Sequence, residues 1–423
     1  MPQAGLLKRP LRRRWTRLCA TGNTQPGSGR WMPPCAFENG MGSATFTFQT
    51  AGRVTFGRGA RVSAAQAVAA FGTGVCLVRG HSVVWVDALE AELSAAGCSI
   101  QSIRCRAEPD IDMLQEALAQ IKAGPVDVVV AVGGGSVMDL GKALAALAPG
   151  DAPVLDHLEG VGKGLPLRAA PLPFVAIPTT AGTGSEVTKN AVIGVPGSGR
   201  KVSLRDDRML ARLAIVDPEL MDDAPKDVTL ASGLDALVQV IEPYLSKRSN
   251  PVTDALCREA IPKAAHALAR LLEGEDAQAR DDMAFASLCG GMALANAGLG
   301  AVHGLAGAIG GRSGAPHGLI CGRLLGGVLQ ANRAALSGLN QQAARFDEVA
   351  AHLSQAFGIR TPIDAAAWAD MLDSWGLARL GRWMTPDVCL STVAQDAAVS
   401  SSMQANPCTL SEADLVRLIK AVL

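Results

Sequence analysis

Three residues in the C-terminal half of the chain have the types and spacing of a metal site. Asp235 is followed four residues later by Gln239, a spacing that puts both side chains on one face of a helix. His303 and His317 each precede a glycine and lie fourteen residues apart. One carboxylate and two imidazoles suit Fe²⁺ or Zn²⁺, with a coordination position left for a substrate. Asp235, His303 and His317 are therefore the candidate catalytic residues, and Gln239 is a weaker candidate for the fourth metal ligand.

Two glycine-rich loops each follow a predicted strand. The first lies between a buried strand at 126–132 and a helix, whose free N–H groups and positive dipole end suit a pyrophosphate. The second, Pro178–Thr188, is rich in hydroxyls and glycines. Ligands of open α/β sheets bind at the carboxyl ends of the strands, where such loops lie. We therefore predict that a dinucleotide contacts Gly133, Gly134, Gly135, Ser136, Asp139, Thr179, Thr180, Thr183 and Ser185.

The elements that carry these loops alternate up to about residue 222. The predicted strands are 75–78, 100–105, 126–132, 174–177 and 214–216, with helices at 83–97, 111–123 and up to 146. This alternation indicates βαβ units and a mainly parallel sheet. We expect an α/β dinucleotide-binding domain over 44–224.

After Pro225 the strand signals stop and helical periodicity dominates. The predicted helices are 229–246, 251–272, 279–299, 301–311, 316–337, 343–357, 363–375 and 410–422, the last one capped by Thr409. We expect an all-α domain over 225–423 that holds the metal and the substrate.

Residues 1–43 differ from the rest of the chain, because they are rich in arginine and contain one acid, Glu38. No apolar segment follows the basic cluster, which argues against a secretory signal. A transit peptide, a disordered tail and upstream sequence preceding a natural start at Met41 are the alternatives, and we favour the last two.

The composition limits the partners. Lys and Arg together number 39, as do Asp and Glu, so the formal charge is zero and nothing points to nucleic acid or an anionic membrane. The uncharged stretch 290–311 is rich in glycine and interrupted by Asn296 and His303, so we expect no membrane span. The ten cysteines form no CxxC pair, which favours reduced thiols in a cytoplasmic protein. Those in apolar sequence are Cys76, Cys98, Cys257, Cys289 and Cys321. We also expect a homo-oligomer, at its simplest a dimer.

The chain resembles the iron-containing (group III) alcohol dehydrogenases over about 44–423. The matching motifs are Gly133–Ser136 with Asp139 and Lys142, Pro178–Thr188, Ile215–Leu220, Gly233–Glu242, Val302–Gly304 and Pro316–Gly318. The resemblance implies a dehydroquinate synthase-like fold with the active site in the cleft between the two domains. It also implies an NAD(P)-dependent enzyme that interconverts an alcohol and an aldehyde or ketone, with a metal as Lewis acid. A maleylacetate-reductase-like enzyme and a nucleotide-binding pseudoenzyme are the alternatives.

Two departures mark a divergent member. Typical members of the family have a histidine as fourth metal ligand where this chain has Gln239, and a further active-site histidine where it has Gly307. Gln239 has three interpretations. It binds the metal through its amide oxygen, or it bonds the substrate carbonyl in a metal-free site, or it reflects lost catalysis. Gly307 removes a proton-relay group, and a positioned general acid typically contributes about 10²–10⁴-fold.

The cofactor preference is predicted from the end of the first strand. NAD-preferring members have an aspartate there for the adenosine ribose, whereas this chain has Gly80, with Arg79 beside it. No carboxylate would repel a 2′-phosphate, and Arg79 is available to bind one. We therefore expect NADP to be preferred over NAD.

Overall fold

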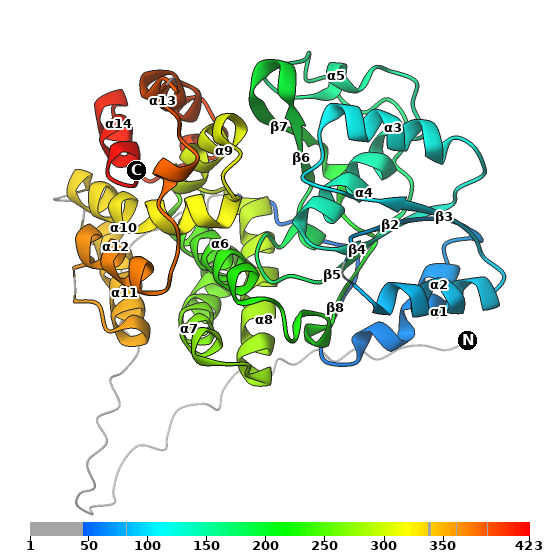
Figure 1. Cartoon of the computed structure of the whole chain (residues 1–423), viewed down its shortest axis with the longest axis horizontal. Helices are drawn as coiled ribbons and strands as arrows, with labels where there is room; N and C mark the ends of the chain where they lie inside the picture. The colour runs from blue at the N-terminus through cyan, green and yellow to red at the C-terminus, as the bar shows by residue number, and fades with distance from the viewer. Residues whose placement is uncertain (1–44, 82, 337–339, 361, 387) are drawn as a thin grey trace, which may run out of the picture. The chain divides into compact units, whose positions relative to one another are not determined.

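A six-stranded parallel sheet forms the centre of the N-terminal half (Figure 1), in a computed structural model that describes residues 45–81, 83–336, 340–360, 362–386 and 388–423. The strand order is β1-β8-β5-β4-β2-β3, and every neighbouring pair is parallel. This confirms the predicted sheet. The strands are β1 (Val54–Phe56), β2 (Gly74–Arg79), β3 (Ser99–Arg104), β4 (Val128–Gly133), β5 (Phe174–Pro178) and β8 (Leu213–Val216).

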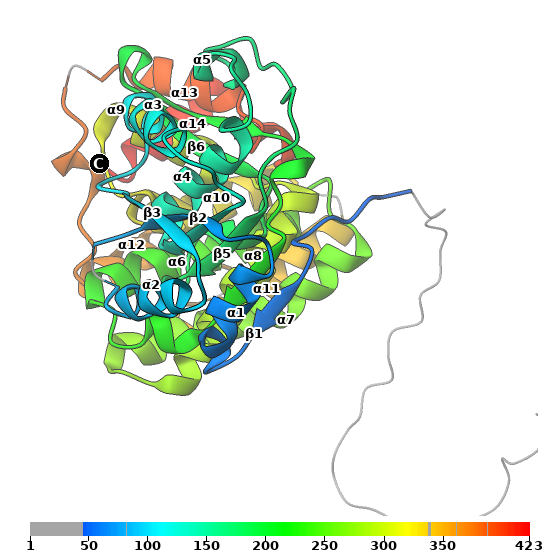
Figure 2. The same cartoon turned by 90° about the vertical axis from the view of Figure 1, so that its right-hand side faces the viewer.

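Helices cover both faces of this sheet (Figures 1 and 2). Along β4, Val129 and Ala131 belong to one hydrophobic cluster with α3 (Ile111–Ile121) and α4 (Gly135–Leu147), while Val130 packs on the opposite side. The opposite side is covered by α1 (Ala64–Ala69) and α2 (Trp85–Ala95). A strand buried on both faces needs no polar alternation, which explains the continuous apolar run of β4.

The register of the sheet places the two glycine-rich loops next to each other. Strands β4 and β5 are neighbours, and Gly133 at the end of β4 pairs with Pro178 at the end of β5. The backbone N–H of Thr179 continues the pairing by donating to the carbonyl of Gly133 at 2.9 Å. Both loops therefore leave the sheet at the same edge, as the sequence predicts.

Several elements lie outside the predicted pattern. An antiparallel hairpin of β6 (Asn190–Val195) and β7 (Arg200–Arg205) follows the second loop. The edge strand β1, the short helices α1 and α5 (Val154–His157), and helix α13 (Leu390–Ala398) were also not predicted. The hairpin is half-exposed, so its strands lack the continuous apolar runs that identify the central sheet.

The C-terminal half is helical, as predicted. Its other helices are α6 (Lys226–Leu245), α7 (Pro251–Glu273), α8 (Ala277–Ala297), α9 (Ala301–Ser313), α10 (His317–Ala335), α11 (Asn340–Phe357), α12 (Ala365–Ser374) and α14 (Glu412–Lys420). The predicted start of the last helix is wrong, because Ser411 and Asp414 form its capping box in place of Thr409. Whether 44–224 and 225–423 are separate domains stays a prediction. The predicted tail, 1–43, lies outside the described residues.

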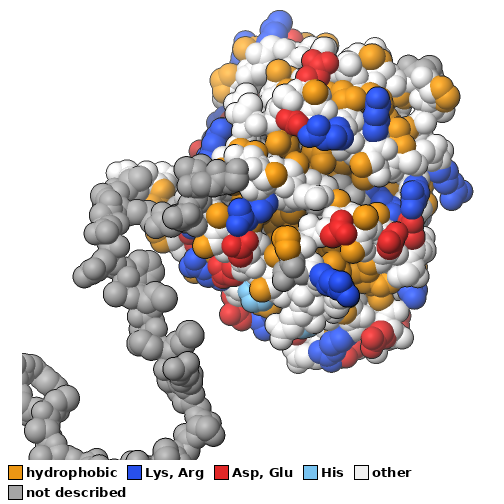
Figure 3. Space-filling model, turned by 90° about the vertical axis from the view of Figure 1, so that its left-hand side faces the viewer, with side chains coloured by type: hydrophobic (Ala, Val, Ile, Leu, Met, Phe, Trp, Pro, Cys, Tyr) orange, Lys and Arg blue, Asp and Glu red, His pale blue; other side chains and the backbone are white. Residues whose placement is uncertain are grey.

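The surface formed by the last helices carries both signs of charge among apolar side chains (Figure 3). Among the described helices, none is by itself long and apolar enough to cross a membrane. The pair α8 and α9, which meet at 96°, passes that length and composition test together.

Candidate metal and dinucleotide site

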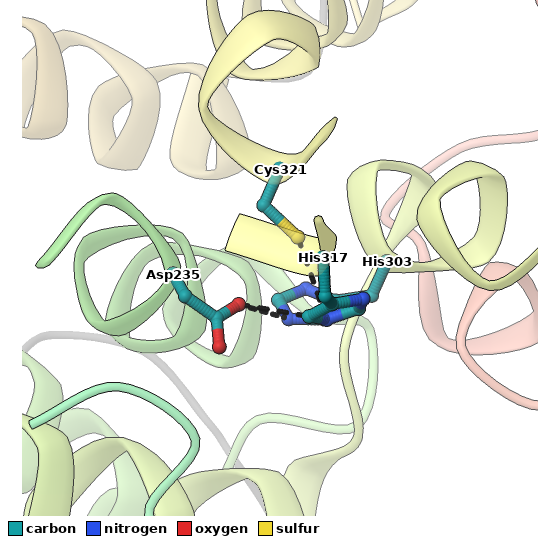
Figure 4. A group of neighbouring side chains, drawn as sticks. All are labelled: Asp235, His303, His317 and Cys321. Carbon is teal, nitrogen blue, oxygen red and sulfur yellow. Dashed lines mark hydrogen bonds and ion pairs between the residues drawn. The ribbon is translucent and has the colours of Figure 1, made fainter. Parts of the chain in front are cut away.

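Three helices bring the predicted metal ligands together (Figure 4). Asp235 lies in the middle of α6, His303 in the first turn of α9, and His317 at the first position of α10. Nε2 of His303 lies 3.3 Å, and Nε2 of His317 3.6 Å, from Oδ1 of Asp235. Asp235 and His303 are buried, whereas the His317 side chain is 37% exposed. The predicted trio thus forms one cluster, which solvent reaches from the side of His317.

A fourth side chain, Cys321, joins this cluster. It lies one helical turn after His317 in α10, is fully buried, and places Sγ 3.6 Å from Nε2 of His317. One ligand atom from each of the four residues lies within 4.8 Å of all the others. From the sequence, Cys321 is predicted only to be a buried thiol. The signal that could have found it is its spacing of four residues from His317.

Glu242 was also missed as a functional residue, and it fixes the orientation of His303. Its buried carboxylate lies 2.7 Å from Nδ1 of His303 and accepts a hydrogen bond from the backbone N–H of Val302, also at 2.7 Å. With Nδ1 bonded to Glu242, Nε2 is the nitrogen that points at Asp235. Metal-binding histidines usually have such a carboxylate partner on their second nitrogen.

The charges of the cluster support one another. Burial disfavours the charged form of Asp235, but the imidazoles of His317 and His303 outweigh burial and hold its pKa below the ordinary value. Burial also opposes protonation of His317, yet Cys321 and Asp235 raise its pKa to about 9. Protons and a metal would therefore compete for these imidazoles.

The cluster fits a divalent metal. Oδ1 of Asp235 and Nε2 of His303 are buried and have no hydrogen-bond partner within the described part of the chain. A tetrahedral zinc site with ordinary bond lengths separates nitrogen from oxygen by about 3.4 Å and nitrogen from sulfur by about 3.6 Å. The separations of 3.3 Å and 3.6 Å from Asp235 to the imidazoles, and 3.6 Å from His317 to Cys321, match these values.

Gln239 is held toward the second glycine-rich loop. Its buried side chain donates a hydrogen bond from Nε2 to the carbonyl of Thr183 at 2.6 Å. The same face of α6 therefore contacts the metal cluster through Asp235 and the loop through Gln239. Gly307 follows His303 by one turn of α9, and a Cβ added there would meet no atom of the described residues within 4 Å. The space around a Cβ at position 307 is thus open.

The two glycine-rich loops pack against each other. A Cβ on Gly134 would lie 3.2 Å from Oγ1 of Thr180, and a Cβ on Gly135 would lie 2.8 Å from Cγ2 of Thr183. Among the described side chains none caps the N-terminus of α4, so its first N–H groups stay free for an anion. The predicted cofactor residues Gly133, Gly134, Gly135, Ser136, Thr179, Thr180 and Thr183 are therefore adjacent.

Asp139 and Ser185, also predicted to bind the cofactor, bond to each other. Oγ of Ser185 donates to Oδ1 of Asp139 at 2.7 Å, and the fully buried Lys142 donates to Oγ1 of Thr188 at 2.7 Å. Burial lowers the pKa of Lys142 and raises that of neighbouring Glu186 to about 7. What the structure shows for Asp139 and Ser185 is a role in holding the second loop on α4, and their contact with a cofactor stays a prediction.

Arg79 is already engaged by two carboxylates. Its buried side chain places Nη1 2.6 Å from Asp87 and 3.2 Å from Glu90, both in α2. These two ion pairs weaken the prediction that Arg79 is available to bind a 2′-phosphate. Gly80 is open, with the nearest atom to an added Cβ 3.7 Å away.

A small hollow opens beside the second loop. Thr179, Thr180 and Ala181 line it from the α/β half, and Thr229, Ser232 and Arg280 are among the residues that line it from the helical half. The space between the two halves is therefore contiguous with the loops proposed to hold a dinucleotide.

Comparisons with known proteins agree with this architecture, in which a parallel α/β sheet is joined to a helical half that carries the candidate metal ligands. The family model "Iron-containing alcohol dehydrogenase" matches residues 51–218, and the model of the C-terminal part of that family matches residues 229–423. Choline dehydrogenase of Bacillus subtilis is 33% identical over 321 residues, which are 74% of this chain and 77% of that protein. The chain belongs to the iron-containing alcohol dehydrogenase family.

Other relatives match over a shorter length. Alcohol dehydrogenase 4 of Schizosaccharomyces pombe is 38% identical over 246 residues, 58% of this chain. The chain spans about half the length of several relatives that it matches, 56% in this case. A solved structure of an iron-containing alcohol dehydrogenase from Thermotoga maritima has a TM-score of 0.77 at 26% identity, covering 89% of this chain and 99% of that one.

Proposed function

We propose that this protein is an NAD(P)-dependent oxidoreductase that interconverts a small alcohol and its aldehyde or ketone by hydride transfer, assisted by a divalent metal. The observation that carries the proposal is the cluster of Asp235, His303 and His317 on three helices, one of which, α6, also contacts the second glycine-rich loop through Gln239. One site for a Lewis acid and one for a dinucleotide thus lie on elements in direct contact.

The metal-binding residues have separate tasks. A divalent metal held by Asp235, His303 and His317 would supply a Lewis acid for the substrate oxygen. Asp235 provides the charge, and Glu242 keeps Nδ1 of His303 occupied so that Nε2 faces the cluster. His317, the exposed member, lies on the side from which a substrate enters.

The loops have the task of binding and orienting the dinucleotide, which supplies the hydride acceptor or donor. The free N–H groups at the start of α4 would bind the pyrophosphate. Asp139 and Ser185 hold the second loop in place against that helix. Gln239 fixes the carbonyl of Thr183, so the loop and the metal helix keep a constant separation.

Proton transfer differs from that of typical family members, because Gly307 carries no side chain where they have an imidazole. We propose that the alcohol proton leaves through water or through the nicotinamide ribose hydroxyl. The reaction should therefore be slower or differently buffered than one with a positioned general acid.

We keep the preference for NADP(H) as part of the proposal. It rests on Gly80, which presents no carboxylate to a 2′-phosphate. Asp87 and Glu90 engage Arg79, so we expect the preference to be modest and Asp87→Asn to increase it. A kcat/KM that favours NAD⁺ over NADP⁺ by more than about tenfold, a difference of 1.4 kcal/mol, refutes this part.

The function is tested on the purified protein. Bound metal is measured by elemental analysis, and NADPH and NADH absorbance is followed with a panel of aldehydes and ketones, before and after treatment with a chelator. Metal-dependent turnover supports the proposal. Turnover that survives metal removal favours Gln239 as the group that bonds the carbonyl. Turnover on maleylacetate alone would favour the enoate reductase, and nucleotide binding without turnover the pseudoenzyme.

The cytoplasmic location and the homo-oligomer stay predictions. Cell fractionation tests the location, and light scattering after size-exclusion chromatography tests whether the protein is a dimer.

A further inference from the structure

We infer that Cys321 is the fourth protein ligand of the metal, so that this chain holds its metal with one carboxylate, two imidazoles and one thiolate. The inference rests on the proposed metal-assisted function, but its test reads the ligands of the metal and does not depend on turnover.

The geometry places Cys321 in the cluster, and a second observation supports a cation as the partner of that cluster. Its Sγ is within 4.8 Å of the ligand atoms of Asp235, His303 and His317, and it comes from the helix that carries His317. Independently, Oδ1 of Asp235 and Nε2 of His303 are buried and without hydrogen-bond partners in the described chain. These two atoms lie 3.3 Å apart without a hydrogen bond, and because burying polar atoms unbonded is costly, the pair suits shared coordination of a cation.

Gln239 is the competing fourth ligand, and the structure gives it another task. Its amide nitrogen is committed to the carbonyl of Thr183, which holds the side chain toward the loop. Cys321 is fully buried within the hydrophobic cluster of the helical half, and its Sγ lies against the imidazole of His317. The fourth ligand has thus moved from α6 to α10, and the total of four protein ligands is restored.

The change of donor has a consequence for the metal. Thiolate is a soft ligand, and it shifts the selectivity of a mixed nitrogen and oxygen site toward Zn²⁺ and away from harder cations. Sites of this kind already bind Zn²⁺ more tightly than Fe²⁺, and we expect the thiolate to widen that difference.

Cobalt substitution tests the ligand directly. Co²⁺ bound to a thiolate absorbs intensely in the near ultraviolet through sulfur-to-metal charge transfer, which nitrogen and oxygen ligands do not produce. The metal-free wild-type protein is titrated with Co²⁺ and its absorbance is recorded. We expect one such band per bound cobalt, and we expect Zn²⁺ to displace it.

Three variants assign the band. It should vanish in Cys321→Ser, whose zinc affinity should fall by more than about 100-fold, since outer partners of a metal site alone are worth about 10–100-fold. It should persist in Gln239→Ala and in Cys257→Ala, which removes another fully buried free thiol as a matched control.

The possible results separate this inference from the proposed function. A wild-type protein that binds Co²⁺ without the band, or binds none, overturns the inference, as does a band that persists in Cys321→Ser. Metal-dependent turnover without the band leaves the function standing and refutes the thiolate ligand. The band without turnover on any carbonyl confirms the ligand and refutes the function.

Discussion

Replacing Glu242 with glutamine should weaken metal binding, although Glu242 itself touches no metal. The carboxylate uses Oε1 for the backbone N–H of Val302 and Oε2 for Nδ1 of His303, at 2.7 Å in both cases. Glutamine has only one carbonyl oxygen, so its amide NH₂ must face one of these two groups.

The consequence for His303 follows from proton placement. If the amide donates to Nδ1, the neutral imidazole carries its proton on Nε2, the atom 3.3 Å from Asp235 that would bind the metal. If the amide instead faces Val302, a buried N–H loses its partner, which costs about 1–3 kcal/mol of folding stability. The first arrangement should reduce metal affinity by about 10–100-fold, or about 1.4–2.7 kcal/mol.

The assay is a competition for Zn²⁺ between the metal-free protein and a chromophoric chelator, with the thermal midpoint recorded in parallel. Glu348→Gln is the matched control, because Glu348 also accepts a hydrogen bond in the helical half, from Tyr244, but lies outside the cluster. A zinc Kd of Glu242→Gln within about twofold of the Glu348→Gln value would refute the reasoning on His303.

Three further outcomes are expected. Burial raises the pKa of Glu186 from 4.5 to about 7. The folded state therefore binds the extra proton between these values, and stability falls as pH rises from about 4.5 to about 7, by up to about 3 kcal/mol. Denaturant unfolding of Glu186→Gln across this range should lack that slope, and an unchanged slope counts against the assignment. Gly184→Ala should destabilise by about 2–4 kcal/mol, because φ is 54° and the new Cβ would lie 2.4 Å from the carbonyl of Ser287. Gly164→Ala, with φ of 59° and open space among the described atoms, should show only about 1–2 kcal/mol in the same denaturant experiment, and equal losses would exclude the steric contribution. Gly307→Ala should stabilise α9 by about 0.5–1 kcal/mol, measured as a higher thermal midpoint, and a lower midpoint would mean that the place is not open.

The parts of the site that could be predicted from the sequence are those formed by short sequence motifs. The run of glycines after an apolar strand fixes both where β4 ends and where a ligand can approach, so its position follows from the chain alone. His303 and His317 were identifiable because each precedes a glycine in a stretch with few other polar residues, fourteen residues apart. The parallel sheet was predictable because strand-like and helix-like segments alternate along the sequence. The hairpin β6–β7 was not predicted, because its half-exposed strands lack a continuous apolar run.

The contacts that sequence could not give are those that depend on how elements pack. The sequence around Arg79 does not predict that Asp87 and Glu90, on the next helix, form ion pairs with its guanidinium group. Cys321 lies in apolar sequence like that of Cys289, and both side chains are buried. Only the position of α10 relative to α6 makes one a potential ligand and leaves the other a core residue.

One face of α6 explains why the departures from the family pattern are tolerated together. Asp235, Gln239 and Glu242 follow the spacing of successive turns, and each contacts a different partner: the metal cluster, the carbonyl of Thr183 and the imidazole of His303. A histidine at position 239 would bind the metal, whereas Gln239 donates a hydrogen bond to the second loop. The loss of a ligand on α6 is then offset only if another helix supplies one. Cys321 is the residue placed to do so, because its Sγ lies within 4.8 Å of the ligand atoms of Asp235, His303 and His317.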